Sequence, residues 1–320
     1  MATNINIIKV NHLVKRYKKA KENAVDDLTF DVKEGEFFAL LGPNGAGKTT
    51  TISILTTTLA PTSGTVTLAG YDLEKESAQV RGTTGIIFQK PSLDENLTAE
   101  ENVRFHCILY GIYSYRPTYS LMPQEYKDRL DTLAKVVGIE KEFFKPVKTF
   151  SGGMKRKLEI VRSLMHKPKI LFLDEPTSGL DPLSRRSLWQ YLMHVRKTEN
   201  TTVFLTTHYL EEAEDADRVC VINHGKIVAL GTPDELKNKW VHELLLVDAK
   251  DRKKLTKELD ALNMKYKEDG YIEIQMKDEN AQKVIQSIKT PLSYLHINNP
   301  TLEEAYLEIV GYNKKEGAAE

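Results

Sequence analysis

A glycine-rich stretch followed by lysine and threonine is the part of the sequence that most directly predicts chemistry. Its spacing, two glycines separated by four residues and followed by Lys-Thr, is that of a phosphate-binding loop. Glycines allow the backbone to curl so that successive N–H groups point into one concavity. We expect the lysine to reach the β- and γ-phosphates of a nucleotide and the threonine hydroxyl to bind Mg²⁺. The residues are, in order, Gly42, Pro43, Asn44, Gly45, Ala46, Gly47, Lys48, Thr49 and Thr50.

The segments on either side of this loop predict a strand and a helix. Residues 37–41 are all apolar, as in a strand buried inside a parallel sheet. A helix over residues 50–57 would place its N-terminus at the loop. Because the N-terminus of a helix carries partial positive charge and unpaired N–H groups, it favours a bound phosphate.

Two carboxylates follow another apolar run, residues 170–173. Ligands in α/β folds bind at the carboxyl ends of strands, so Asp174 is expected to hold Mg²⁺ through water and Glu175 to orient or activate an attacking water. The alternative is a solvated acidic strand end. His208 follows the predicted strand 202–206, and it is either an ordinary surface side chain or a contact to the γ-phosphate.

A second glycine turn opens a second helix. Ser151, Gly152 and Gly153 lie at its predicted N-terminus, which makes another anion site. Two phosphate-type sites in one chain indicate either a cleft that closes or a site shared between two copies. Four side chains at helical spacing are predicted to form the buried face of this helix: Met154, Leu158, Val161 and Met165.

Two further polar or aromatic residues leave alternatives open. Tyr17 lies in a basic segment, residues 15–21, which is either a solvated loop or a platform on which a purine base stacks. Gln89 ends the predicted strand 86–88 and is either a loop residue or a ligand.

Four tyrosines fall within residues 110–119, a segment too rich in glycine, proline and serine for a helix. The segment is either a small self-packed surface loop or an aromatic contact surface for a partner.

The composition bounds the class of protein. The 320 residues carry 45 Lys+Arg and 45 Asp+Glu, and a formal net charge of zero disfavours a nucleic-acid partner. Cys107 and Cys220 lie in apolar stretches and are expected to be reduced, buried thiols. Because no apolar run has the length of a membrane span, we expect a soluble chain whose membrane role, if any, depends on another polypeptide.

The order of these motifs resembles that of the ATP-binding subunit of an ABC transporter, over residues 5–238. The resemblance implies that Tyr17 stacks on adenine and that Gly42 to Thr49 is the Walker A loop. Gln89 would contact Mg²⁺ and sense the membrane subunit. Phe150 and Met154 depart from the family's Leu-Ser-Gly-Gly-Gln signature, but the serine and both glycines remain.

The resemblance also implies a site shared by two subunits. Ser151, Gly152 and Gly153 would cap the γ-phosphate bound by the opposite subunit, and Asp181 would belong to the loop between subunits. Asp174 and Glu175 would be the Walker B aspartate and the catalytic carboxylate, with His208 as the switch histidine. The implied catalytic set is Glu175, His208, Lys48 and Gln89, and the implied metal set is Thr49, Gln89 and Asp174.

The expected fold is α/β: a P-loop NTPase of ABC type with a mixed-sheet core, an antiparallel β subdomain and a helical subdomain at about 90–165. This domain would cover residues 1–238. Alternating strand and helix signals predict a small α+β domain over 239–312, followed by a disordered tail, 313–320. Residues 299–307 resemble the C-terminal extension of ATPases that serve drug, lipid or polymer exporters.

The expected function is therefore ATP hydrolysis that powers transport through a separate permease. Two copies, as a homodimer, would close head to tail on two ATP and two Mg²⁺, at the cytoplasmic face of the cell membrane. The alternative is a soluble ABC-type ATPase of translation or DNA repair, although such proteins usually carry a second ATPase domain or a long coiled-coil insert.

Overall fold

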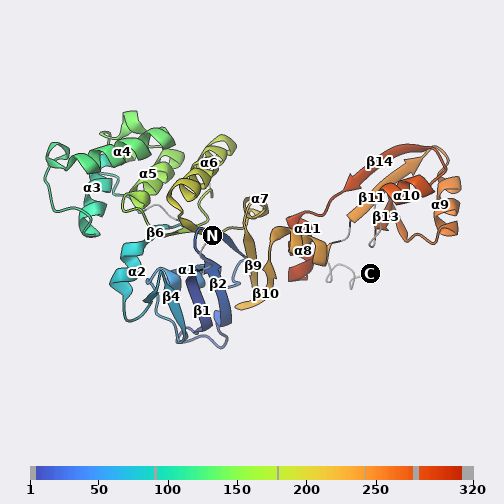
Figure 1. The fold of residues 1–320 in the computed structure, drawn as a ribbon, viewed down its shortest axis with the longest axis horizontal. Coiled ribbons are helices and arrows are strands. Elements are labelled where there is room, and N and C mark those ends of the chain that lie inside the picture. The colour runs from blue at the N-terminus through green and yellow to red at the C-terminus, as the bar shows by residue number, and fades with distance from the viewer. Residues whose placement is uncertain (1–4, 90–91, 179, 242, 277–280, 312–320) are drawn as a thin grey trace. The chain divides into compact units, whose positions relative to one another are not determined.

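The computed structural model describes residues 5–89, 92–178, 180–241, 243–276 and 281–311. The chain forms two compact units, residues 1–228 and 229–320, and each is described by itself (Figure 1). The two compact units meet after residue 228, ten residues before the domain boundary expected at 238/239. The expected boundary itself remains a prediction. The predicted tail, 313–320, lies outside the described residues.

A six-stranded sheet with the strand order β10-β9-β3-β8-β7-β6 forms the core of the first unit. The neighbours β9–β3, β3–β8, β8–β7 and β7–β6 all pair in parallel. Every residue of β3, β7 and β8 is buried, which explains why these strands are nearly continuous apolar runs. The strands are β3 Phe37–Leu41, β6 Thr84–Ile87, β7 Ile170–Asp174, β8 Thr202–Thr206, β9 Arg218–Asn223 and β10 Lys226–Gly231.

An antiparallel sheet with the order β2-β1-β4-β5 packs its apolar side chains into the same core. The strands are β1 Asn6–Lys15, β2 Val25–Lys33, β4 Ser63–Leu68 and β5 Tyr71–Asp72. Bulges at residues 10–15 let the first strand continue to Lys15, where it pairs with Val25 of β2. The expected α/β class, with its separate antiparallel sheet, is confirmed.

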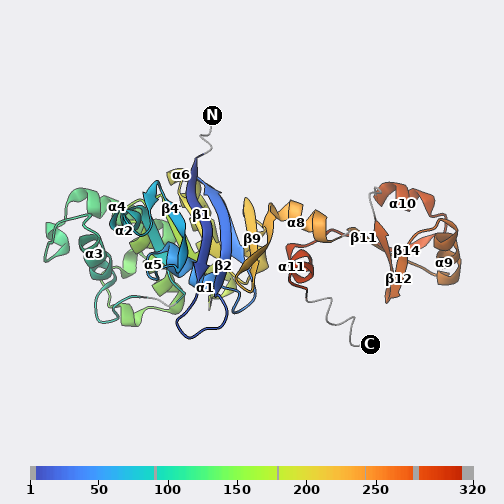
Figure 2. The same cartoon turned by 90° about the horizontal axis from the view of Figure 1, so that it is seen from below.

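A helical region stands beside the core sheet and supplies the third expected part of the first unit (Figures 1 and 2). Its central helix, α5 Gly152–Leu164, packs against α3 Ala99–Leu109 and α4 Gln124–Val137. The remaining helices of this unit are α1 Lys48–Leu55, α2 Ser77–Thr83, α6 Pro182–Glu199 and α7 Leu210–Ala213.

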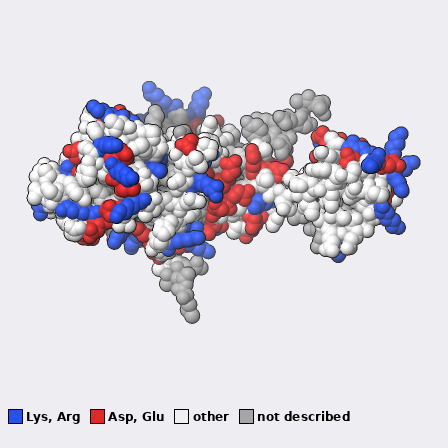
Figure 3. Space-filling view, turned by 90° about the horizontal axis from the view of Figure 1, so that it is seen from above, with Lys and Arg blue, Asp and Glu red and all other residues white. Residues whose placement is uncertain are grey.

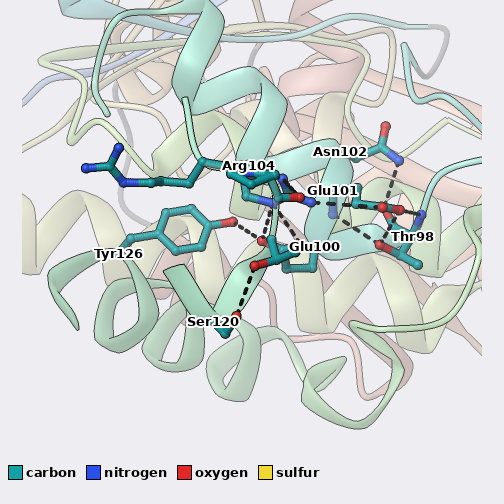
Figure 4. Close-up of polar contacts among 10 residues, drawn as sticks. Thr98, Glu100, Glu101, Asn102, Arg104, Ser120 and Tyr126 are labelled. Carbon is teal, nitrogen blue, oxygen red and sulfur yellow. Dashed lines mark hydrogen bonds and ion pairs between the residues drawn. The ribbon is translucent and has the colours of Figure 1, made fainter. Parts of the chain in front are cut away.

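A network of hydrogen bonds and ion pairs between polar side chains stabilises the helical region (Figure 4). Thr98 and Glu101 form the capping box that begins α3, as their spacing predicts. One turn inside, Glu100 accepts from Arg104 Nε at 3.0 and 3.1 Å and from the Tyr126 hydroxyl at 3.0 Å. These bonds satisfy charges that would otherwise be costly to bury.

The same network holds the tyrosine-rich loop. Arg104 Nη1 donates to the carbonyls of Arg116, at 2.8 Å, and Pro117, at 3.0 Å. Tyr113 and Tyr119 pack edge-on against Tyr126, with ring centroids 5.6 and 6.4 Å away. Self-packing therefore accounts for these two tyrosines.

The second unit contains a four-stranded antiparallel sheet in the order β12-β13-β11-β14. Leu245, Val247 and Ile272 pack with α9 and α10 side chains into a separate apolar core. In the same unit, α8 packs against α11, and both helices begin with capping boxes. The elements are α8 Pro233–Trp240, β11 Glu243–Ala249, α9 Arg252–Ala261, β12 Tyr266–Asp269, β13 Tyr271–Met276, α10 Ala281–Ser287, β14 Leu292–Asn298 and α11 Leu302–Val310.

Candidate active site

The predicted phosphate-binding loop connects β3 to α1, in the expected strand–loop–helix arrangement. Gly47 adopts φ 106° as the N-cap of α1, a conformation that favours glycine. A Cβ at Gly42 would lie 2.3 Å from the Ile222 carbonyl oxygen, so that position also requires glycine. Lys48 Nζ donates to the carbonyls of Gly42, at 2.6 Å, and Pro43, at 3.1 Å, which folds its side chain back over the loop.

Two carboxylates at the carboxyl end of β7 act electrostatically on this lysine. Burial lowers the pKa of Lys48, while the nearby carboxylates of Glu175 and Asp174 act in the opposite direction. Burial raises the pKa of Asp174, even though the Thr206 hydroxyl donates to its Oδ1 at 2.5 Å. A buried carboxylate whose ionisation is disfavoured gains stability from a bound cation.

The carboxylate of Glu175 contacts two of the other three predicted catalytic residues, Gln89 and His208. Gln89 Nε2 donates to Glu175 Oε2 at 2.7 Å, and His208 Nδ1 lies 3.1 Å from Glu175 Oε1. The backbone of Glu175 has φ 46°, a left-handed conformation that is uncommon for a residue with a Cβ. The ends of β6, β7 and β8 thus bring Gln89, Glu175 and His208 together.

Tyr17 lies beside the first turn of α1. Its hydroxyl is 3.3 Å from Thr50 Oγ1, and the residue is 46% exposed. Thr49, the predicted Mg²⁺ ligand, is also exposed on this turn. An accessible aromatic ring next to the phosphate loop is the arrangement that base stacking requires.

The second glycine turn forms an accessible helix start. Ser151 is the N-cap of α5, where its hydroxyl accepts from the backbone N–H of Met154 at 3.3 Å. A Cβ at Gly152 would have no neighbour within 4 Å, whereas one at Gly153 would lie 3.3 Å from Ser184 Oγ. Asp181 caps the neighbouring helix α6 by accepting from the Ser184 N–H at 3.0 Å.

The prediction that Met154 belongs to the buried face of α5 is wrong. Leu158, Val161 and Met165 are buried, but Met154 is only half-buried, because it lies in the first turn of α5 at the surface. The positions that complete the buried face include two polar side chains that form an ion pair, Arg156 and Glu159, which the apolar spacing does not predict.

Comparison with known proteins identifies the family of this chain. The profile of the ABC transporter family matches residues 25–178, which include the phosphate loop, Gln89 and Glu175. The linearmycin resistance ATP-binding protein LnrL of Bacillus subtilis is 34% identical over 316 residues, covering 92% of this chain and 96% of LnrL. A probable multidrug ATP-binding protein of Escherichia coli, YbhF, is 39% identical over 231 residues, covering 72% of this chain but only 38% of YbhF.

A solved structure extends the comparison to the fold. A dimeric ATP-binding cassette in a post-hydrolysis state, with bound ADP and phosphate, is 26% identical, with a TM-score of 0.63, covering 70% of this chain and 98% of that one. The chain belongs to the ABC transporter family. It carries the family's ATP-binding domain, and its relative LnrL is named as an ATP-binding protein. Within its described residues, no helix combines the length and the apolarity needed to cross a membrane.

Proposed function

We propose that two copies of this chain close head to tail on two ATP molecules and so power transport through a separate membrane permease. Each ATP would lie between the phosphate loop of one copy and Ser151, Gly152 and Gly153 of the other. The observation that carries the proposal is the contact of Gln89 and His208 with Glu175, beside Lys48. In the proposed reaction, Glu175 as base, Gln89 as polar sensor and Lys48 as cation would surround one phosphate site.

The side chains have separate roles in the proposed reaction. Glu175 orients and activates the attacking water, and His208 contacts the γ-phosphate. Lys48 exchanges its carbonyl partners for phosphate oxygens, which form stronger, charge-assisted bonds. Tyr17 stacks on the adenine ring.

Mg²⁺ fits the residues of this site. The hydroxyl of Thr49, the carboxylate of Asp174 and the amide oxygen of Gln89 are oxygen ligands, which Mg²⁺ prefers, and the burial that raises the pKa of Asp174 favours a neighbouring cation. The metal would neutralise charge on the phosphate oxygens. Among the described residues, no group of three or more His, Cys, Asp or Glu side chains could hold a metal ion by itself, so the phosphates would complete the ligand set.

The accessibility of the second glycine turn supports the shared site. Ser151 and Gly152 are exposed, so another molecule can approach the N-terminus of α5. Asp181 begins the adjacent helix and is exposed too, which suits a residue between two subunits. Its pKa is lowered by hydrogen bonds to Ser184, so it remains charged at neutral pH.

The names of the relatives favour a transporter over a soluble ATPase of translation or repair. LnrL is named for linearmycin resistance and DrrA of Mycobacterium tuberculosis for doxorubicin resistance, so we propose export as the direction. The face seen in Figure 3 carries mixed blue and red side chains and a group of red ones, with no broad basic patch among the described residues on this face. The proposed location is the inner face of the cell membrane, through the permease.

The helical region offers an apolar surface for that permease. Four of its side chains are strongly exposed, from 57% for Leu121 to 84% for Leu109, with Tyr115 and Phe144 between these values. Exposed aromatic and aliphatic side chains of this kind are typical of interfaces. Arg104 holds the loop that carries Tyr115 in place.

Replacing Tyr115 and Leu121 together by alanine is expected to reduce recovery of the permease with the tagged ATPase by about tenfold, since interface anchors each contribute on the order of 1 kcal/mol or more. Basal hydrolysis by the purified ATPase is expected to be unchanged. Val136→Ala, on the exposed side of α4, is the control. Undiminished recovery of the permease with the double variant would exclude this surface as the docking site.

The second unit is proposed to add contacts between copies. Its strand β14 is an edge of the sheet, and Leu295 and Ile297 on it are more than 40% exposed. An exposed apolar edge strand favours pairing with another chain. Introducing lysine at both positions is expected to weaken the ATP-dependent dimer about tenfold without changing the ATP affinity of the monomer. Glu268→Lys, on the opposite edge strand β12, is the control, and equal dimer affinity in both variants would contradict the proposed contact.

A further inference from the structure

Arg156 is a buried side chain, 4% exposed, that joins α5 to the ends of two catalytic strands. Its Nε donates to the Pro176 carbonyl at 2.6 Å, and its Nη2 donates to the carbonyls of Asp174, at 3.3 Å, and Glu175, at 3.1 Å. Its Nη1 donates to the Phe88 carbonyl, directly before Gln89. All three nitrogens of the guanidinium group therefore donate hydrogen bonds, and each nitrogen bonds to a different part of the backbone.

The hydrogen bond from Arg156 to the Glu175 carbonyl stabilises a residue whose backbone is left-handed. A φ of 46° is disfavoured for glutamate and persists only where its surroundings enforce it. The Glu175 N–H donates to the Thr206 carbonyl at 2.9 Å, and its C=O accepts from Arg156. These two bonds hold the peptide groups on either side of the Glu175 Cα and so set the direction of its side chain.

Glu159 extends the connection to the far side of the Gln89 segment. Its Oε2 accepts from Arg156 Nη1 at 2.9 Å, and its Oε1 accepts from the backbone N–H of Ser92 at 2.9 Å. Arg162 Nη1 donates to the Ser92 carbonyl at 2.7 Å. Helix α5 thus holds the chain both immediately before Gln89, at Phe88, and after it, at Ser92.

We propose that Arg156 is a positioning residue for ATP hydrolysis. It aligns Glu175 and Gln89 with each other and with the helix whose N-terminus carries Ser151. Because Arg156 bonds to backbone carbonyls and to Glu159 rather than to the phosphate loop, it acts on the chemical step and not on nucleotide binding. This inference rests on the proposed role of Glu175 as the group that activates water.

Arg156→Lys tests the inference, because lysine keeps the charge beside Glu159 but cannot donate in three fixed directions. We expect kcat for ATP hydrolysis to fall about 10- to 100-fold, as for a displaced catalytic group. KM and the Kd of a non-hydrolysable ATP analogue should stay within about twofold of the wild-type values. Arg129→Lys is the matched control: Arg129 binds Glu199 and the Leu164 carbonyl at the other end of α5, and kcat should change by less than about twofold.

The double variant Arg156→Lys/Glu175→Gln separates positioning from a general structural role. If Arg156 acts by aligning Gln89 with Glu175, its effect requires an intact Glu175 carboxylate. Adding Arg156→Lys to Glu175→Gln then causes no further loss of the residual activity, because groups that act as a unit are not additive. A further loss, or a parallel loss of ATP affinity in Arg156→Lys, would overturn the proposal.

Three additional outcomes would decide between these roles. Should Arg156→Lys not fold, Glu159→Gln, which keeps an oxygen for Ser92 but weakens the hold on Arg156, is expected to lower kcat with KM unchanged; a kcat equal to that of Arg129→Lys would contradict the inference. Normal hydrolysis by Glu175→Gln alone would refute the role of Glu175 itself. An inactive Glu175→Gln together with a fully active Arg156→Lys would refute only the role of Arg156.

Discussion

Glu175→Gln is expected to lower kcat for ATP hydrolysis by about 10²- to 10⁴-fold, the contribution typical of a general base. Glutamine preserves the shape of the side chain and can still bond to Gln89 and His208, so the site should remain folded. ATP affinity should be retained, because the lost interaction acts in the transition state and not in the ground state.

Steady-state phosphate release and equilibrium ATP binding measure the two quantities separately. Glu211→Gln is the matched control, since Glu211 is an exposed glutamate on the short helix that follows His208. The control should hydrolyse ATP at the wild-type rate. Hydrolysis by Glu175→Gln at a rate close to that of the control would remove Glu175 from the catalytic set.

Lys48→Ala is expected to lose ATP affinity, whereas Ser151→Ala is expected to lose hydrolysis and dimerisation. Lys48→Ala removes charge-assisted bonds to phosphate, worth about 1.5–3 kcal/mol each, so the Kd for ATP should rise by about 10- to 100-fold. Ser151→Ala should leave ATP binding by the monomer unchanged, because in the proposed dimer Ser151 contacts the ATP bound by the other copy. It should still impair hydrolysis and ATP-dependent dimerisation.

Mixing the two variants tests the head-to-tail arrangement. A dimer of one Lys48→Ala copy and one Ser151→Ala copy contains one site in which both the phosphate loop and the second glycine turn are intact. ATPase activity should therefore recover on mixing, above the sum of the separate activities. If no activity returns although mixed dimers form, Ser151 and Lys48 act within one copy.

The parts of the site that depend on local spacing were predictable from the sequence. The phosphate loop and the carboxylate pair each follow an apolar strand, and parallel strands bring their carboxyl ends to one edge of a sheet. Helix α4 follows a helical apolar pattern and strand β13 an alternating one, so both elements can be located from neighbouring residues alone. The capping boxes at Thr98, Thr232 and Thr301 likewise depend only on neighbouring residues.

Features that depend on distant segments could not be predicted. Arg156 and Glu159 lie on a helix whose apolar spacing identifies only hydrophobic neighbours, and their partners Phe88, Ser92 and Pro176 come from other elements. The left-handed backbone of Glu175 has no local signal, since no glycine or asparagine marks it. The only available signal at Arg156 was its position one and a half turns after the serine cap, on the buried side of α5.

The central claim, that two copies close on two ATP molecules, is tested most directly by sedimentation of the Glu175→Gln protein with and without ATP, combined with a count of bound nucleotide. The account predicts a monomer without ATP and, with ATP, a dimer that retains two ATP molecules. The same protein carrying Ser151→Ala as well should remain monomeric under identical conditions. A Glu175→Gln protein that binds ATP and stays monomeric, or that dimerises equally well with Ser151 replaced, would contradict the shared site.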